Sequence, residues 1–423
     1  MFSRIRDRNI WIVYGAVLLL GTAYGLAVAV IALHLDARGF DKKSIGALAV
    51  WFASGIVALA LPAGQLVRRW SAKYTLVAAL AGYAVSVAVF PTLRSFEAIA
   101  VARFADGAFS ACIWVACETV LLERSDAVNK AFVTSLYAMA VAVGYVIGPL
   151  AANAIVHVAP MPVAFLTSGA IAASSCLLVA LRLDRRISAP AGHAASLAAS
   201  QAPRASSLAL LAANKTSCFA TFAYGYFQAS VVLFLPLYLI ESKGIARGQT
   251  IVIPAFFAAG MLLFASLAGR AGDRLGHLFV MRVLAAIGMA MILGFVFIGS
   301  FAPMAVAVFV AGATLASISP VSLALQGVTT AVHDYGRANA IYNTFYAAGI
   351  LCGPPISSAL FALYGGAAML FHLAALWGAF LIFAAVFASD DPAWRRTRTR
   401  SPRPPVRQVG AGERQPRPSS SAP

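Results

Sequence analysis

Residues 269–277 read Gly-Arg-Ala-Gly-Asp-Arg-Leu-Gly-His, and residues 64–73 read Gly-Gln-Leu-Val-Arg-Arg-Trp-Ser-Ala-Lys. Gly64 precedes Gly269 by 205 positions, and Arg69 precedes Arg274 by the same number. This offset, kept without a gap over about a hundred residues, indicates a duplicated half-protein rather than a short solenoid unit. Four further pairs keep it: Gly39 and Gly244, Gly144 and Gly349, Gly148 and Gly353, and Pro149 and Pro354.

The composition places this duplicated chain in a membrane. Of its 423 residues, 61% are hydrophobic and only 11% are charged, whereas a soluble domain carries about 25% charged residues. A transmembrane helix needs roughly 20 mostly apolar residues, and the runs found here are too long for barrel strands. Twelve such runs occur, near 10–35, 44–67, 73–93, 95–122, 130–155, 161–182, 214–240, 248–269, 278–300, 302–330, 337–363 and 366–388. We therefore expect an all-α membrane protein with twelve transmembrane helices in two pseudo-symmetric six-helix halves, an arrangement typical of transporters.

The expected organisation has four parts. Residues 1–183 form the first half, and 210–389 form the second. Residues 184–209 are rich in Ala and Ser and form a cytoplasmic linker. Residues 390–423 are rich in Arg, Pro and Ser, bury little apolar surface, and are predicted to be disordered. The arginines of this tail act either as retention charges on the cytoplasmic side of the membrane or as ligands for anionic lipid headgroups.

The basic residues predict the orientation. If both termini are cytoplasmic and the spans alternate, 25 of the 32 Lys and Arg residues are cytoplasmic, six are outside, and Arg103 lies within the membrane. Cytoplasmic loops of membrane proteins carry such an excess of basic residues. The net charge of +17 therefore reflects topology rather than nucleic-acid binding. We expect a multi-pass protein of a bacterial cytoplasmic (inner) membrane, with its first apolar run kept as an uncleaved span.

Residue patterns for a metal, a cofactor or a reaction are weak. The five cysteines fall within predicted spans without a CxxC pair, which favours packing over disulfides or metal. His277 and Met281 form one H-x-x-x-M spacing, too little to predict copper. The chain has no P-loop and no HExxH motif, so we expect no ATP use, no cofactor and no enzyme activity.

The loop at residues 269–277 closely resembles the signature loop of the major facilitator superfamily, G-x-L-x-D-R-x-G-R. The first copy departs from it, with Arg68 in place of Asp and Ser71 in place of Gly. Arg103 and Gly107 resemble a second signature, R-x-x-x-G, and the Gly-x-x-x-Gly-Pro elements resemble one found mostly in proton-coupled exporters of that superfamily. The resemblance covers nearly all of residues 5–388. Its finer features, Ile113-Trp114, Glu118-Thr119 and Leu235–Tyr238, resemble the YcaD-like branch.

This resemblance implies residues that gate the two halves. Glycine lets helices approach closely, and the Asp and Arg of the loop can pair with charges and helix ends of neighbouring spans in one state. Ordinary turn charges are the alternative, which the repeat makes less attractive. The predicted gating residues are Gly64, Arg68, Arg69, Gly269, Asp273, Arg274, Gly276, Gly144, Gly148, Pro149, Gly349, Gly353 and Pro354.

Acidic residues inside the spans are the second candidate site, because charges in the membrane are costly and usually functional. Arg103 and Asp106 are three positions apart on one helical face. They form either a proton-coupling pair, in which Asp106 takes up the proton, or a static ion pair that fixes the helix. Glu118 is expected either to pair with Arg68 or Arg69 as a gate or to contact substrate.

Polar and aromatic residues of several spans are the candidate cavity lining. In folds of this superfamily, the first, fourth, seventh and tenth helices surround the substrate, and the fifth, eighth and eleventh lie beside them. The candidates are therefore Tyr24, Trp114, Tyr224, Phe227, Gln228, Asn343 and Tyr346, with packing between helices as the alternative for part of the set. An aromatic pocket with few fixed charges suits an amphipathic solute that is neutral or cationic.

Together these features predict a secondary active transporter that works by alternating access. Its expected partners are an unknown small-molecule substrate, protons and membrane lipids, and we expect a monomer. Proton-driven efflux is favoured over uptake of a small metabolite. A sensor or scaffold without transport activity is the third possibility, favoured if Arg103 and Asp106 can be replaced without effect.

Overall fold

A computed structural model describes residues 7–124, 130–184, 205–331 and 334–391. No strand occurs in these ranges, and twelve helices are long and apolar enough to cross a membrane, which confirms the predicted fold class. The predicted linker and tail fall mostly on residues 185–204 and 392–423, which lie outside the described ranges.

Six long helices form the first half, and their order follows the predicted spans. They are α1 (Arg8–Ala37), α2 (Lys42–Trp70), α3 (Ala72–Val89), α4 (Phe96–Arg124), α5 (Lys130–Val158) and α6 (Pro162–Arg182). Asp7 and Asp41 cap α1 and α2 by accepting the backbone N–H groups of Asn9 and Ser44. Such caps satisfy N–H groups that have no partner inside the helix.

The second half repeats this pattern with two of its spans divided. Its helices are α8 (Ser207–Lys243), α9 (Arg247–Ile251), α10 (Ile253–Leu275), α11 (His277–Phe295), α12 (Phe301–Ala311), the π-helical element η3 (Gly312–Ala316), α13 (Ser317–Thr329), α14 (Tyr335–Tyr364) and α15 (Gly366–Val386). α8 begins three residues before the predicted boundary at 210, because Ser206 accepts the backbone N–H of Ala209 and caps the helix there.

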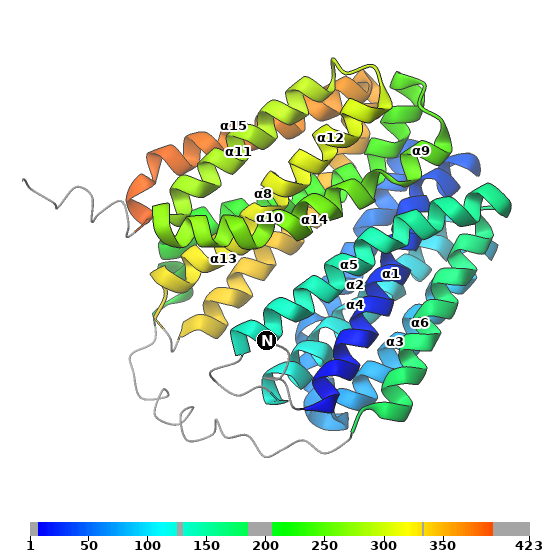
Figure 1. Ribbon diagram of the computed structural model, residues 1–423, viewed down its shortest axis with the longest axis horizontal. Helices are drawn as coiled ribbons and strands as arrows, with labels where there is room; N and C mark the ends of the chain where they lie inside the picture. The colour runs from blue at the N-terminus through cyan, green and yellow to red at the C-terminus, as the bar shows by residue number, and fades with distance from the viewer. Residues whose placement is uncertain (1–6, 125–129, 185–204, 332–333, 392–423) are drawn as a thin grey trace, which may run out of the picture.

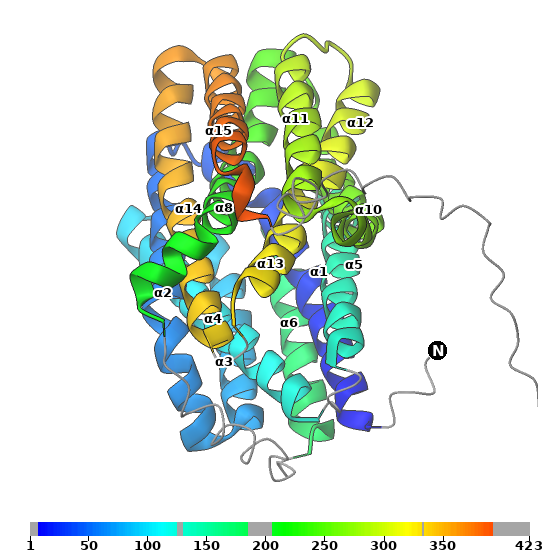
Figure 2. The same ribbon diagram turned by 90° about the vertical axis from the view of Figure 1, so that its left-hand side faces the viewer.

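The two halves lie side by side as separate bundles, one made of α1–α6 and the other of α8–α15 (Figure 1). Within each half, α1 packs on α5 and α8 packs on α14. Between the halves, α2 packs on α14 and α5 packs on α10. Figure 2 shows most of the long helices running along roughly the same axis, with α10 seen nearly end-on.

The helices end at two opposite faces of the molecule, the linker face and the turn face. The linker face is the end where α1 begins at Arg8, α6 ends at Arg182 and α8 begins at Ser207. The turn face is the opposite end, where the turns at 38–41 and 244–246 connect α1 to α2 and α8 to α9. The two bundles meet near α9 on the turn face and diverge toward the linker face (Figure 1).

Close helix crossings repeat in both halves and explain several of the glycines. A Cβ atom on Gly144 would lie 2.6 Å from the backbone nitrogen of Thr22, and one on Gly353 would lie 2.5 Å from the carbonyl oxygen of Tyr226. The Gly-x-x-x-Gly-Pro elements therefore join α5 to α1 and α14 to α8, inside each half. Small residues permit such approach in membranes, where packing rather than water exclusion drives association.

Candidate functional site

The charged residues of α4 form a buried pair. Arg103 makes an ion pair with Asp106, whose residue surface is only 6% exposed. The Asp106 carbonyl accepts a hydrogen bond of 2.6 Å from the hydroxyl of Ser110. The Arg103 guanidinium also lies 4.3 Å from the ring centre of Phe52 on α2, which gives it a second favourable contact.

An aromatic cluster of the first half surrounds this pair. The hydroxyl of Tyr24 meets that of Ser110, which connects α1 to the pair on α4. The Tyr24 ring stacks on Tyr83 of α3 with centroids 4.9 Å apart. Trp114 and Tyr145 lie on other sides of it, each with its ring centre 6.4 Å away. The cluster thus joins residues of α1, α3, α4 and α5 around one carboxylate.

A second aromatic cluster lies in the other half. Tyr346 of α14 donates a hydrogen bond of 2.9 Å to the side-chain carbonyl of Gln228 on α8. The rings of Tyr346 and Tyr224 stack with centroids 6.1 Å apart. Tyr145 of the first half lies within electrostatic range of both tyrosines. The two clusters therefore approach each other across the boundary between the halves, at Tyr145.

Sequence reasoning missed Tyr83, Ser110 and Tyr145. Tyr145 directly follows Gly144 in the Gly-x-x-x-Gly-Pro element, so the close α1–α5 crossing places it beside Tyr24. That neighbouring glycine was a usable signal. No sequence signal marks Tyr83 or Ser110, because apolar spans contain many tyrosines and serines. The direction in which their side chains point depends on how the helices pack.

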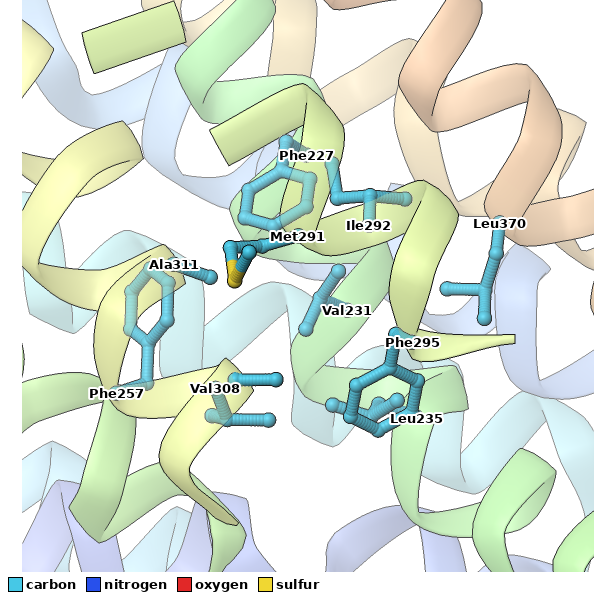
Figure 3. Close-up of a pocket in the computed structure, with 11 residues that line it drawn as sticks. Phe227, Val231, Leu235, Phe257, Met291, Ile292, Phe295, Val308, Ala311 and Leu370 are labelled. Atoms are coloured by element: carbon cyan, nitrogen blue, oxygen red, sulfur yellow. The ribbon is translucent and has the colours of Figure 1, made fainter. Parts of the chain in front are cut away.

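Two predicted cavity residues do not join these clusters. Phe227 is 2% exposed and points into its own half, with Phe257 and Trp377 each 6.2 Å away between ring centres. It lines an apolar pocket between α8, α10, α11, α12 and α15 (Figure 3). This pocket lies within the second half and has no polar lining, so we regard it as a packing feature rather than a substrate site. Asn343 is exposed on α14.

Glu118 lies one turn of α4 beyond Trp114 and is exposed. In the described part of the chain, no ion pair involves it. Arg69 is exposed, and the side chain of Arg68 lies outside the description. The expected pairing of Glu118 with either arginine therefore stays a prediction.

The signature loop joins α10 to α11 at the linker face. The Asp273 side chain is 71% exposed, and a carboxylate oxygen lies 3.3 Å from Nε2 of His277 in the same loop. Gly269 has open space where a Cβ would stand, and Gly276 has a φ of +99°. Gly64 is partly buried on α2, and Arg274 is exposed. The loop makes its described contacts within the second half.

The sequence pattern of the Major Facilitator Superfamily matches residues 11–216 and 217–419, one match for each half. The chain belongs to the major facilitator superfamily. It is a multi-pass membrane transporter. This agrees with the two-bundle fold, the twelve spans and the repeated glycine crossings described above.

Relatives cover nearly the whole chain. An uncharacterized MFS-type transporter, YcaD of Salmonella paratyphi B, is 22% identical over 389 residues, covering 91% of this chain and 97% of the relative. YcaD of Salmonella enteritidis PT4 is 23% identical over the same shares. The predicted resemblance to the YcaD-like branch is therefore confirmed.

Solved structures share the fold. A bacterial homologue of the human lysosomal transporter Spinster, inward-facing and occupied, has a TM-score of 0.72 at 13% identity and covers 93% of this chain and 97% of its own. The nucleoside transporter NupG has a TM-score of 0.69 at 14% identity, with 91% and 99% covered. At these identities the likeness concerns the fold alone.

Proposed function

We propose that this transporter exports amphipathic aromatic solutes, neutral or cationic, in exchange for protons, by alternating access in a bacterial cytoplasmic membrane. The linker face is the cytoplasmic one, supported by the excess of basic residues on that side. The substrate binds between the two aromatic clusters that approach each other at Tyr145. Stacking rings and hydroxyl groups suit flat solutes with few charges.

The buried Arg103–Asp106 pair carries this proposal. A carboxylate in a membrane interior is costly to keep charged, and the cost falls when a proton neutralises it. When Asp106 takes up a proton, Arg103 loses its ion-pair partner and keeps its contact with the Phe52 ring. The Asp106 backbone, Ser110 and Tyr24 connect this change to α1 and to the aromatic lining. Proton uptake and substrate release are thereby linked at one site.

The first prediction tests this site with Asp106→Asn in reconstituted vesicles. The wild-type protein is expected to move protons when a fluorescent planar organic cation is added, recorded with a pH-sensitive dye inside the vesicle. Asp106→Asn should abolish proton movement and gradient-driven accumulation, because its amide does not titrate. It should still exchange the dye across the membrane.

The direction of the gradient decides between export and uptake. Export requires accumulation of the dye on the turn-face side with protons moving the opposite way, and movement of both in the same direction would establish uptake. If Asp106 is only a structural partner, its variant should lose thermal stability and all transport together. Full gradient-driven accumulation by Asp106→Asn would exclude a coupling role and move the assignment to Glu118.

A further inference from the structure

Four charged residues at the turn face keep the 205-residue repeat. Asp36 near the end of α1 corresponds to Glu241 near the end of α8. Lys42 at the start of α2 corresponds to Arg247 at the start of α9. Each half therefore presents this acid and this base, six positions apart, around the same turn, in addition to Arg38 and Asp41 in the first half and Lys243 in the second.

The acid of each half pairs with the base of the other half. Lys42 Nζ lies 2.9 Å from Oε1 of Glu241, and a guanidinium nitrogen of Arg247 lies 3.8 Å from Oδ2 of Asp36. Lys42 also lies 4.8 Å from the ring centre of Phe361 on α14, again across the boundary. Among the ion pairs described, these two are the ones that join the halves.

Each acid and the base of its own half stand on either side of a single turn. Gly39 and Gly244 have φ values of +83° and +65°, the left-handed region that reverses the chain tightly. Asp36 and Lys42 thus flank one short turn, as do Glu241 and Arg247. The same four charges can therefore pair either across the halves or within them.

We propose that Asp36, Lys42, Glu241 and Arg247 form the gate of the turn face and that they exchange partners during transport. With the turn face closed, as in the structure, the pairs cross the boundary. With that face open, each acid pairs with the base of its own half. No charge loses its partner for long, so the gate opens at low cost. This rests on the alternating access proposed above and adds the residues that regulate it.

Neighbouring basic residues provide a matched control. Arg38 and Lys243, also 205 apart, donate hydrogen bonds to the carbonyls of Pro91 and Val296, which share the same offset. Each of these bonds stays inside one half. Removing these two charges changes the turn face without touching a bond between the halves.

The test measures the two states directly in the full-length protein in nanodiscs. The five native cysteines are first replaced. Spin labels are then attached at Arg94→Cys and Gly299→Cys, which are exposed positions on the turn-face loops of the two halves. The distance between the labels reports how far apart the halves lie at this face. Lys42→Gln with Arg247→Gln should increase the longer-distance population roughly three- to tenfold, as expected for two exposed pairs. Arg38→Gln with Lys243→Gln should not.

Charge swaps separate partner exchange from a static pair. Asp36→Lys with Arg247→Glu preserves opposite charges in both contacts between the halves and makes the contact within each half repulsive. Partner exchange therefore predicts a smaller longer-distance population, whereas a static pair predicts the wild-type distances. Adding Lys42→Glu and Glu241→Lys restores opposite charges everywhere and should restore the wild-type distances. Wild-type distances in a thermally stable protein that carries Asp36→Lys and Arg247→Glu would overturn the partner exchange.

A measurement on the protein without gate substitutions tests the gate even when a variant does not fold. High salt screens exposed pairs, so 1 M salt should also enlarge the longer-distance population. Unchanged distances in salt and in the Gln variants would overturn the gate. These readouts need neither substrate nor protons, so they test the gate independently of the proposed proton coupling. A wild-type protein that shows one distance under every condition would instead contradict alternating access.

Discussion

Ser71 is a residue at which the first half departs from its copy in sequence but keeps the same backbone geometry. It connects α2 to α3 with φ +89° and ψ +155°, while the matching Gly276 has φ +99° and ψ +132°. Ser71 is the one residue other than glycine in the described ranges with a positive φ. Side chains are strained in this region, at a cost of about 1–3 kcal/mol.

Ser71→Gly is therefore predicted to stabilise the protein by about 1 kcal/mol, because relief of strain exceeds the added freedom of glycine in the unfolded chain. Thermal unfolding of the purified protein in detergent should show a higher midpoint. Gly276→Ser, which introduces the same strain in the second half, should lower it. A lower midpoint for Ser71→Gly would show that the Ser71 conformation carries no net strain.

Asp7 provides a prediction that depends on pH. Burial alone would raise its pKa, but hydrogen bonds from the Asn9 backbone N–H at 2.8 Å and from Arg124 at 3.1 Å outweigh it and hold the pKa below the usual 3.8. A carboxyl whose pKa is lowered by folding stabilises the fold above its unfolded pKa. That stabilisation is lost as the pH falls through the folded pKa.

Asp7→Asn should therefore lower the midpoint of thermal unfolding at pH 7, and the difference from wild type should shrink as the pH falls below about 4. Unfolding curves between pH 3 and pH 7 measure this. A difference that stays constant with pH would mean that Asp7 acts through its shape rather than through its charge.

At the scale of helices, the fold depends on crossings at which glycine has no substitute. A Cβ atom on Gly107 or on Gly312 would collide with the carbonyl of Phe52 or of Phe257. These glycines are 205 apart, and so are the two phenylalanines. The α2–α4 crossing of the first half is thus repeated between α10 and η3. The second crossing coincides with the start of the π-helical turn η3, whereas α4 is a regular α-helix at Gly107.

Gly312→Ala is predicted to destabilise the protein by about 1–3 kcal/mol, the usual cost of adding atoms to a packed contact. Gly294→Ala is the matched control, because a Cβ there meets no atom within 4 Å. It should be neutral or slightly stabilising, since alanine favours a helix more than glycine does. Thermal unfolding compares the two variants. Equal midpoints would show that the crossing can relax.

At the scale of the whole molecule, two ion pairs join the halves at the turn face, and the signature loop of the linker face is exposed. Asp273 is 71% exposed and contacts His277 of its own half. If the loop latches the halves, it does so in the other state, in which the linker face closes.

Asp273→Asn is therefore predicted to leave thermal stability unchanged and to reduce the population with a closed linker face, roughly two- to fivefold for one exposed charge pair. Distance measurements between labels on the linker-face ends of the two halves give these populations. Arg270→Gln, which removes an exposed charge of the same loop, is the control. Unchanged populations and unchanged transport would count against the latch.

The sequence alone determined the twelve spans, the two halves and the superfamily. Partitioning of a helix into lipid depends on the local run of apolar residues, and duplication leaves a constant offset. Both can be read without knowing any contact between distant residues. The Arg103–Asp106 pair was also predictable, because residues three apart on a helix are neighbours wherever the helix lies.

The tertiary structure alone decided which residues meet between helices. The tyrosine at 145 approaches Tyr224 because α5 crosses α1 closely and α1 packs on α8. Phe227 turns into its own bundle, where it contacts Trp377. The offset relates Asp36 to Glu241 and Lys42 to Arg247, yet it does not tell which acid pairs with which base. That choice depends on how the two bundles pack against each other in a given state. Such packing is a property of the assembled molecule and is not encoded in any local stretch of sequence.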